Sequence, residues 1–271
     1  MAEKKPFLSK EQAEAIAQQI PTPYHVYDEA GIRERCRMLK DAFSWNPRFH
    51  EYFAVKATPN PYILKIMQEE GMGADCSSYT ELLMSERIGY RGDDIMFSSN
   101  VTPAEDFQKA AELGAIINFD DISHIDYYKE VVGGEFPETM CVRYNPGGEF
   151  IVANNIMDNP GEAKYGLTRP QMTEAFNKLK SYGVKKMGIH SFLVSGSTSN
   201  DYYPKLARTL FELAVELHKE TGMEIDFINL SGGVGVAYKP EETPADIKII
   251  GDGVKAAYED VLTSAGMDNV A

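Results

Sequence analysis

Short apolar runs alternate with longer amphipathic segments along most of the chain. The runs predict strands at 24–27, 51–55, 73–76, 94–98, 115–119, 139–144, 186–193 and 224–230. The segments between them predict helices at 30–43, 60–70, 79–89, 103–113, 121–132, 168–182, 202–222 and 245–265. Most of the runs are continuous rather than alternating, which is typical of strands that are buried on both faces.

Several predicted helices carry a start signal. Pro59 and Pro103 stand at or near first helical positions, and Thr102 is placed to cap the helix at 103–113. Asp120 and Asp121 are placed to cap the helix that follows the run at 115–119. These signals support the predicted boundaries between strands and helices.

The regular repeat of strand and helix predicts one α/β domain with a parallel sheet. From residue 51 onward the repeat is regular enough to favour a (β/α)₈ barrel of the TIM type over a doubly wound sheet, but only seven strands are present. The chain stops at "SAGMDNVA", where an eighth strand would begin, so we expect an incomplete barrel from a longer product. We divide the chain into an N-terminal segment at 1–45, with a strand and the first helices, and a barrel at 46–271.

Composition narrows the possible functions. Apolar residues make up 43% of the chain and charged residues 25%, as in soluble globular proteins, and no run of apolar residues could span a membrane. The net charge of −14 argues against partners such as nucleic acid or anionic membranes. The N-terminus lacks a secretory signal, and the three scattered cysteines match neither a metal site nor a disulfide framework. These features favour a cytoplasmic protein without a bound metal.

Polar residues gather where the predicted strands end. In a barrel of this kind the active site lies at the carboxyl ends of the strands. Strands one to seven end in Lys56, Asp75-Cys76-Ser77-Ser78, Ser98-Ser99-Asn100, Asp120, Arg143-Tyr144-Asn145-Pro146, Gly188-Ile189-His190-Ser191-Phe192 and Ser231-Gly232-Gly233-Val234-Gly235. Each has an ordinary structural explanation on its own: a solvated lysine, a helix cap at Asp75, an ion pair at Arg143, a core histidine at His190 or a tight turn.

Together these strand ends point to one chemistry. A glycine-rich turn lets backbone N–H groups approach a phosphate closely, and Ser195 and Ser231 are placed to add hydroxyl donors. A lysine that loses its hydration at the barrel mouth tends toward the neutral amine, which can attack an aldehyde and form a Schiff base. A lysine and a phosphate cradle on one barrel face predict pyridoxal 5'-phosphate as the cofactor.

Six motifs then match one family in the correct order. "YFAVKATPNP" resembles the "Y-A-x-K-A-N" motif of the fold-type III pyridoxal-phosphate decarboxylases, and "DCSSYTEL" resembles their "D-x-x-S-x-x-E-L". "RYNP", "AKYG" and "NLSGGVGVAY" resemble "R-I-N-P", "S-K-F-G" and "N-x-G-G-G-x-G-x-x-Y", and "GIHSFLVS" stands where "G-x-H-x-H-I-G-S" is expected. "TPYHVYD" and "RYNP" are most similar to the diaminopimelate decarboxylase branch.

The resemblance implies an alanine-racemase-like barrel and assigns roles. Lys56 would hold the cofactor covalently and be catalytic, and Gly232, Gly233 and Gly235 would bind its phosphate with help from Ser195. The cofactor would also be contacted by Asp75, Arg143 and His190. The implied reaction is loss of CO₂ from meso-diaminopimelate to give L-lysine, the last step of lysine biosynthesis, in a homodimer of the full-length protein. The truncated chain alone is expected to be inactive.

Two departures from the family pattern leave alternatives open. The second histidine of the "H-x-H" motif, expected to stack on the cofactor ring, is Phe192 here, so either His190 or Phe192 faces the cofactor. The family's "E-x-G-R" segment on strand eight and its C-terminal β domain are absent from the chain. The run at 24–27 would normally join that domain, so we expect it to be poorly supported. The alternatives are a related ornithine, arginine or carboxynorspermidine decarboxylase, or a catalytically incomplete barrel that binds pyridoxal phosphate or a partner protein.

Overall fold

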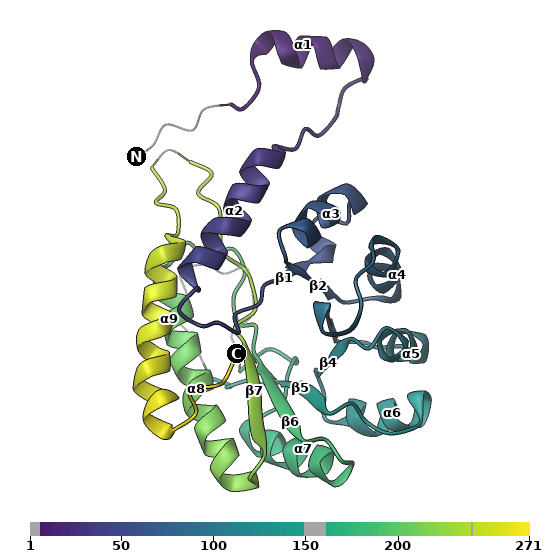
Figure 1. The fold of residues 1–271 in the computed structure, drawn as a ribbon, viewed down its shortest axis with the longest axis vertical. Helices are drawn as coiled ribbons and strands as arrows, with labels where there is room; N and C mark the ends of the chain where they lie inside the picture. The colour runs from purple at the N-terminus through teal and green to yellow at the C-terminus, as the bar shows by residue number, and fades with distance from the viewer. Residues whose placement is uncertain (1–5, 149–160, 240) are drawn as a thin grey trace.

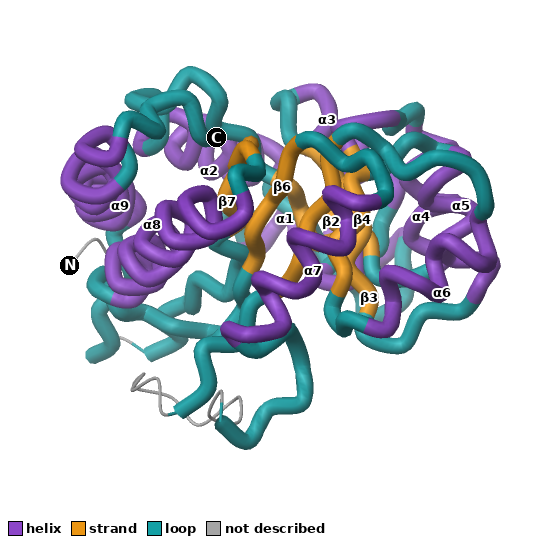
Figure 2. The backbone as a smooth tube through the Cα atoms, turned by 90° about the horizontal axis from the view of Figure 1, so that it is seen from below, coloured by secondary structure: helices purple, strands orange, loops and turns teal. Residues whose placement is uncertain are grey.

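Seven parallel strands form one curled sheet in this computed structural model, which describes residues 6–148, 161–239 and 241–271. The strands pair in chain order from β1 to β7, and helices surround them (Figures 1 and 2). The strands are β1 Tyr52–Ala54, β2 Gly73–Cys76, β3 Ile95–Ser99, β4 Ile116–Phe119, β5 Thr139–Arg143, β6 Lys186–His190 and β7 Glu224–Asn229. This arrangement confirms the prediction of an incomplete (β/α) barrel.

The helices follow the strands in the predicted order. They are α3 Pro61–Glu69, α4 Tyr79–Ile88, α5 Ala104–Glu112, α6 Ser123–Val132, α7 Arg169–Ser181, α8 Tyr202–Thr221 and α9 Ile247–Val261, with short 3-10 turns η1 Val55–Ala57, η2 Gly92–Asp94 and η3 Thr263–Ala265. Among the described residues, no helix has the length and apolar character needed to cross a membrane. The apolar core lies between this helical layer and the outward side of the strands, where residues such as Phe97, Phe119, Val142 and Ile189 are buried. The strands therefore turn alternate residues toward the helices and toward the barrel interior.

Two helix starts differ from the sequence prediction. Thr102 does not cap α5: its hydroxyl donates to the carbonyl of Ser99, and Pro103 is the N-cap residue. Asp121 does accept a hydrogen bond from the backbone N–H of Ser123 at 2.8 Å, but Asp120 is engaged elsewhere. Short polar side chains at these positions have several local partners within reach, and the pattern of the sequence does not decide between them.

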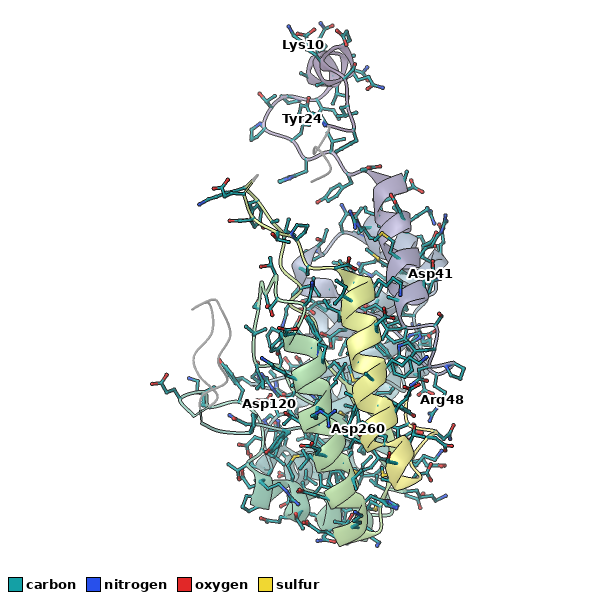
Figure 3. All side chains as sticks on the ribbon, turned by 90° about the vertical axis from the view of Figure 1, so that its left-hand side faces the viewer. Lys10, Tyr24, Asp41, Arg48, Asp120 and Asp260 are labelled. Atoms are coloured by element: carbon teal, nitrogen blue, oxygen red, sulfur yellow. The ribbon has the colours of Figure 1, made fainter. Side chains whose placement is uncertain are left out.

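The N-terminal segment contains helices where a strand was expected. α1 Lys10–Gln19 stands away from the barrel, and α2 Glu29–Ala42 leads back to it (Figures 1 and 3). The predicted strand at 24–27 is wrong, because these residues pair with no strand in the described part of the chain. α1 was not predicted from the sequence, although Ser9 and Gln12 form a reciprocal capping box at its start.

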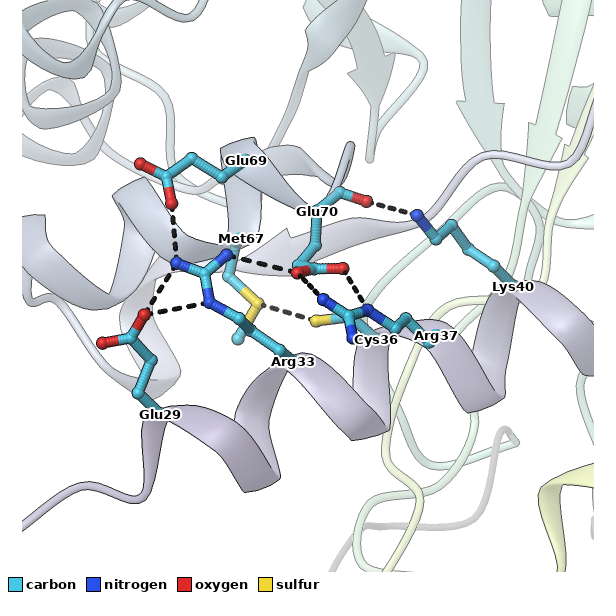
Figure 4. Close-up of polar contacts among 8 residues, drawn as sticks. All are labelled: Glu29, Arg33, Cys36, Arg37, Lys40, Met67, Glu69 and Glu70. Carbon is cyan, nitrogen blue, oxygen red and sulfur yellow. Dashed lines mark hydrogen bonds and ion pairs between the residues drawn. The ribbon is translucent and has the colours of Figure 1, made fainter.

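Three cations fix α2 against the barrel. Arg33 and Arg37 both bond to the carboxylate of Glu70, at 3.2 and 2.8 Å, and Lys40 donates to its backbone carbonyl (Figure 4). Glu70 follows directly on α3 and is buried. The spacing of the three cations on α2 places them on one helix face, so the ion pairs set how α2 lies along the first barrel helix.

The other side of α2 packs against α9, and the loop after α2 reaches the last described residues. Asn46 donates to the carbonyl of Val270 at 3.0 Å, and Arg48 binds the carboxylate of Asp226 at 2.8 Å. The backbone N–H of Ala271 donates to the carbonyl of Asp226 on β7 at 2.9 Å. These contacts join the segment before β1 to the last residues of the chain, next to β7. They lie at the amino ends of the strands, whereas the predicted site lies at the carboxyl ends.

Candidate active site

The carboxyl ends of the strands bring the residues of the predicted site to one end of the barrel. Ala54 pairs with Asp75, and Arg143 pairs with His190, so these residues lie at corresponding heights in the sheet. Arg143, His190 and Asn118 face the barrel interior, since Asn118 contacts His190 directly. The predicted residues from β1, β2, β5, β6 and β7 therefore surround one mouth.

Lys56 projects from a turn rather than from a strand. β1 ends at Ala54, and η1 places the lysine in an exposed position. Its Nζ lies 3.5 Å from the hydroxyl of Ser77. The expectation that the strand end would desolvate this amine is wrong for the structure, because the 3-10 turn lifts the side chain out of the wall of the barrel.

The segment after β2 holds the neighbour of Lys56 in place. The N–H of Ser77 donates to the carboxylate of Glu81 at 2.8 Å, and Ser78 caps α4 through a bond to the N–H of Glu81. Asp75 itself lies within β2 and is not a helix cap. The serines and the glutamate of the "DCSSYTEL" motif thus build the turn without using the Asp75 carboxyl.

Two carboxyl groups on this side have perturbed acidity. Burial raises the pKa of Asp75 to about 7, against the opposing effect of the Lys56 charge. Burial, with a smaller contribution from the neighbouring Asp75, also raises the pKa of Glu51 to about 7. No cation among the described residues outweighs the effect of burial on either group, so both acids favour the protonated form more than usual.

Arg143 is held from three directions. Its Nη1 donates to Oδ1 of the buried Asp120 at 2.7 Å, and its Nη2 donates to the carbonyl of Phe192 at 3.2 Å. The guanidinium lies over the ring of Tyr165, 5.3 Å from its centroid. Gly166, in the left-handed region at φ +87°, donates its N–H to the carbonyl of Asp120. The "AKYG" segment and Asp120 therefore hold the side chain of Arg143 in one position.

The glycine-rich turn after β7 packs against the segment that follows β6. The N–H of Ser197 donates to the carbonyl of Gly233 at 2.9 Å, and the N–H of Gly235 donates back to the carbonyl of Ser197 at 2.6 Å. A Cβ atom on Gly233 would lie 2.6 Å from the carbonyl oxygen of Val194, and one on Gly235 would lie 2.3 Å from that of Gly196. These two glycines are therefore required for packing between the two loops, and they bring Ser195 beside the turn.

Gly232 differs from the other two glycines. Its φ lies outside the left-handed region, and a Cβ atom there would meet nothing within 4 Å. Neither backbone conformation nor packing requires glycine at this exposed position. The open space in front of it suits the close approach of a phosphate to the backbone.

Two polar atoms near the mouth have no partner. Ser231 adopts φ +58°, an unusual conformation for a residue other than glycine, and its Oγ is buried without a hydrogen-bond partner in the described part of the chain. Asn118 Oδ1 is likewise buried and without a partner there. Asn118 was not predicted from the sequence, because it lies inside β4 and only the alternation of inward and outward positions along that strand would mark it. An exposed amine, an open glycine turn and unpaired polar atoms at one mouth fit a phosphate-bearing aldehyde such as pyridoxal phosphate.

Comparison with known proteins identifies the family. The family model for the pyridoxal-dependent decarboxylases, pyridoxal binding domain, matches residues 29–270. Protein TabA of Pseudomonas amygdali pv. tabaci is 34% identical over 239 residues, which cover 88% of this chain and 55% of that protein. The diaminopimelate decarboxylase of Methanothermobacter thermautotrophicus is 30% identical over 255 residues, covering 93% of this chain and 59% of the relative.

Solved structures show the same fold. The diaminopimelate decarboxylase of M. jannaschii in complex with L-lysine superposes with a TM-score of 0.83 at 24% identity, covering 92% of this chain and 60% of that structure. The diaminopimelate decarboxylase of Helicobacter pylori, complexed with L-lysine, superposes with a TM-score of 0.78 at 20% identity, with coverages of 91% and 63%. The chain thus spans little more than half the length of the relatives it matches. The match confirms the family resemblance and the predicted cofactor: the chain belongs to the pyridoxal-dependent decarboxylases, in their pyridoxal-binding domain.

Proposed function

We propose that the mouth formed by Lys56, Arg143 and the glycine turn binds pyridoxal 5'-phosphate for the decarboxylation of an amino acid. The observation that carries this proposal is Gly232, where the fold requires no glycine but a phosphate approaching the backbone does. Ser195 and the loop at Gly233 and Gly235 would hold the phosphate, and Lys56 Nζ would bind the aldehyde carbon. When bound, the cofactor would supply an electron sink for the electron pair that stays on the substrate carbon when CO₂ leaves.

The chain's own residues would orient the bound molecule. Arg143, fixed by Asp120, would present a cation at a constant position, since its side chain is held on three sides. The ring of Phe192 lies beside Gly233, 3.4 Å from where a Cβ of that glycine would stand, which supports Phe192 rather than His190 as the residue that stacks on the cofactor. Asp75 would accept or release a proton near Lys56, because its raised pKa lies close to neutral pH.

Reductive trapping tests the role of Lys56. Borohydride treatment with pyridoxal phosphate should fix one pyridoxyl group on Lys56, detected by peptide mass spectrometry. Lys56→Ala should abolish this label and all CO₂ release, while Lys65→Ala should leave both unchanged, because Lys65 is an exposed lysine of α3 that bonds to Gln68. A wild-type chain that is not labelled, or a Lys56→Ala chain that keeps a few per cent of turnover, contradicts the proposal.

We propose meso-2,6-diaminopimelate as the substrate and a homodimer as the working assembly. The diaminopimelate decarboxylases among the relatives support the substrate, although the name of Protein TabA states no reaction. A panel that measures CO₂ release from meso-diaminopimelate, lysine, ornithine, arginine and carboxynorspermidine decides between them. The proposal requires diaminopimelate to be turned over with the highest kcat/KM of the panel.

A further inference from the structure

Three polar side chains form a chain across the barrel interior. Asn118 on β4 donates through Nδ2 to Ser98 Oγ on β3 at 3.0 Å, and the same nitrogen lies 3.1 Å from Nδ1 of His190 on β6. Asn118 is only 2% exposed and His190 only 7%. Buried polar groups are costly unless they are satisfied, and the amide nitrogen of Asn118 meets both Ser98 and His190, whereas its Oδ1 has no partner among the described residues.

The contact with Asn118 determines which nitrogen of His190 carries the proton. With the amide oriented so that Nδ2 faces His190, the NH₂ group donates, Nδ1 of His190 accepts, and the ring proton is on Nε2. Among the described residues, the contact with Asn118 is the only hydrogen bond of the His190 ring, so Nε2 has no protein partner there. The ring therefore presents one unused N–H donor.

The surroundings keep this ring neutral. Burial, and after it the charges of Arg143 on β5 and Lys56 on η1, lower the pKa of His190 to about 3. The neighbour on β7 is Asn229, which carries no charge, and the carboxylate of Asp120 is already paired with Arg143. Among the described residues, no free anion therefore raises the pKa of His190 and favours the imidazolium.

We propose that Asn118 is a positioning residue that holds His190 as its Nε2–H tautomer, and that this N–H donates a hydrogen bond to an anionic oxygen of the bound molecule. The ligand part of this inference rests on the proposed function, whereas the tautomer does not. Both cations that act on His190 attract an anion to this region, and a neutral donor adds specificity without further charge. The oxygen belongs either to the cofactor or to the substrate carboxylate.

The tautomer is tested first in the unmodified chain. Two-bond ¹H–¹⁵N spectra of ¹⁵N-histidine-labelled protein distinguish the two nitrogens of each ring, and His190→Gln identifies the signal by its loss. If that variant does not fold, transfer from the Asn118 amide protons identifies the ring instead. We expect a neutral Nε2–H ring that does not titrate between about pH 5.5 and about pH 8. An Nδ1–H ring, or titration in that range, overturns the inference.

Asn118→Asp is the matched perturbation, because a carboxylate accepts where the amide donates. It should convert the ring to an Nδ1–H or imidazolium form in the same spectra. Ser98→Ala is the control: it removes the other bond of Asn118 and should leave the His190 spectrum unchanged.

Binding measurements with the same variants locate the acceptor oxygen. If it belongs to the cofactor, Asn118→Asp weakens pyridoxal phosphate binding about three- to tenfold. If it belongs to the substrate, cofactor affinity is kept and KM for diaminopimelate rises by a similar factor. When neither quantity changes although the tautomer has switched, the donor role is refuted. A wild-type chain that binds no pyridoxal phosphate refutes the proposed function instead, and the spectra still decide the tautomer.

Discussion

On the β4–β6 side of the barrel mouth, the ionisable groups are held by partners, whereas on the β1–β2 side they are loosely held. Arg143 is bonded to Asp120 and Phe192, and His190 is bonded to Asn118. Lys56 by contrast contacts Ser77 at 3.5 Å, and the charge of Lys56 only partly offsets the effect of burial on the neighbouring Asp75. One side is preorganised, and the other keeps the freedom that the proposed covalent binding of a ligand by Lys56 would require.

The ion pair of Arg143 and Asp120 offers the largest test of this contrast. Asp120→Asn should lower the free energy of unfolding by about 3 kcal/mol, because it leaves a buried guanidinium without its counter-charge. Urea denaturation followed by circular dichroism measures the change. Ser77→Ala, on the loosely held side, should cost less than about 0.5 kcal/mol.

Asp252→Asn is the control for charge removal as such. Its pair with Lys248 lies on the surface of α9, with the two side chains 62% and 77% exposed, so its loss should leave the free energy of unfolding essentially unchanged. Equal effects of Asp120→Asn and Asp252→Asn would remove the basis for calling the β4–β6 side preorganised.

The two carboxyls on the other side predict a pH dependence of intermediate size. Asp75 and Glu51 keep their protons in the folded chain up to a pKa of about 7, while the unfolded chain releases them at lower pH. Their stabilising effect is therefore present in acid and lost as the pH rises toward 7. Because both side chains keep some exposure, we expect these two groups to lower the free energy of unfolding by about 2 kcal/mol between about pH 5 and about pH 8.

Asp75→Asn should flatten this pH dependence, since the amide does not titrate and also relieves the repulsion that raises the Glu51 pKa. Urea titrations of the variant and of wild type at both pH values give the difference. Asp252→Asn again serves as the control and should leave the slope as it is. If Asp75→Asn shows the wild-type slope, the β1–β2 carboxyls are not the source.

The smallest expected effect concerns the turn after β7, next to the rigid side. Ser231→Gly should raise the free energy of unfolding by about 1 kcal/mol, because glycine adopts the left-handed conformation at φ +58° without strain. Gly233→Ala should instead lower it by more than about 2 kcal/mol, since the added Cβ would meet the Val194 carbonyl. Destabilisation by Ser231→Gly would show that the buried hydroxyl matters more than the strain.

Much of the fold follows from periodicity, but the site follows from it only in part. The continuous apolar runs predicted all seven barrel strands, because a strand that is buried on both faces is apolar at nearly every position. The run at 24–27 carries the same local signal and forms no strand, since pairing depends on a neighbour that the sequence does not show. α1 was missed because it buries no residue and therefore lacks an apolar stripe.

Candidate site residues were predicted where a motif marks them and overlooked where only the geometry brings them together. Lys56, Arg143 and the glycines stand in recognisable motifs. Asn118 lies inside an apolar strand, and its role depends on the register that sets it opposite Ser98 and near His190. Lys56 was predicted to follow the first barrel strand, and it does, but its exposure was not predicted. The three-residue turn η1 decides whether its side chain faces the barrel wall or the solvent.

The glycine turn also bears on how much a motif can tell about ligand binding. Gly233 and Gly235 would be retained in any descendant that kept these two loops in contact, even one that had lost every ligand. Gly232 is free of such demands, so it would be expected to drift once nothing approached the backbone. In a distant sequence with this turn, the residue at the position of Gly232 therefore distinguishes a turn that still binds a phosphate from one that only keeps the packing of the two loops.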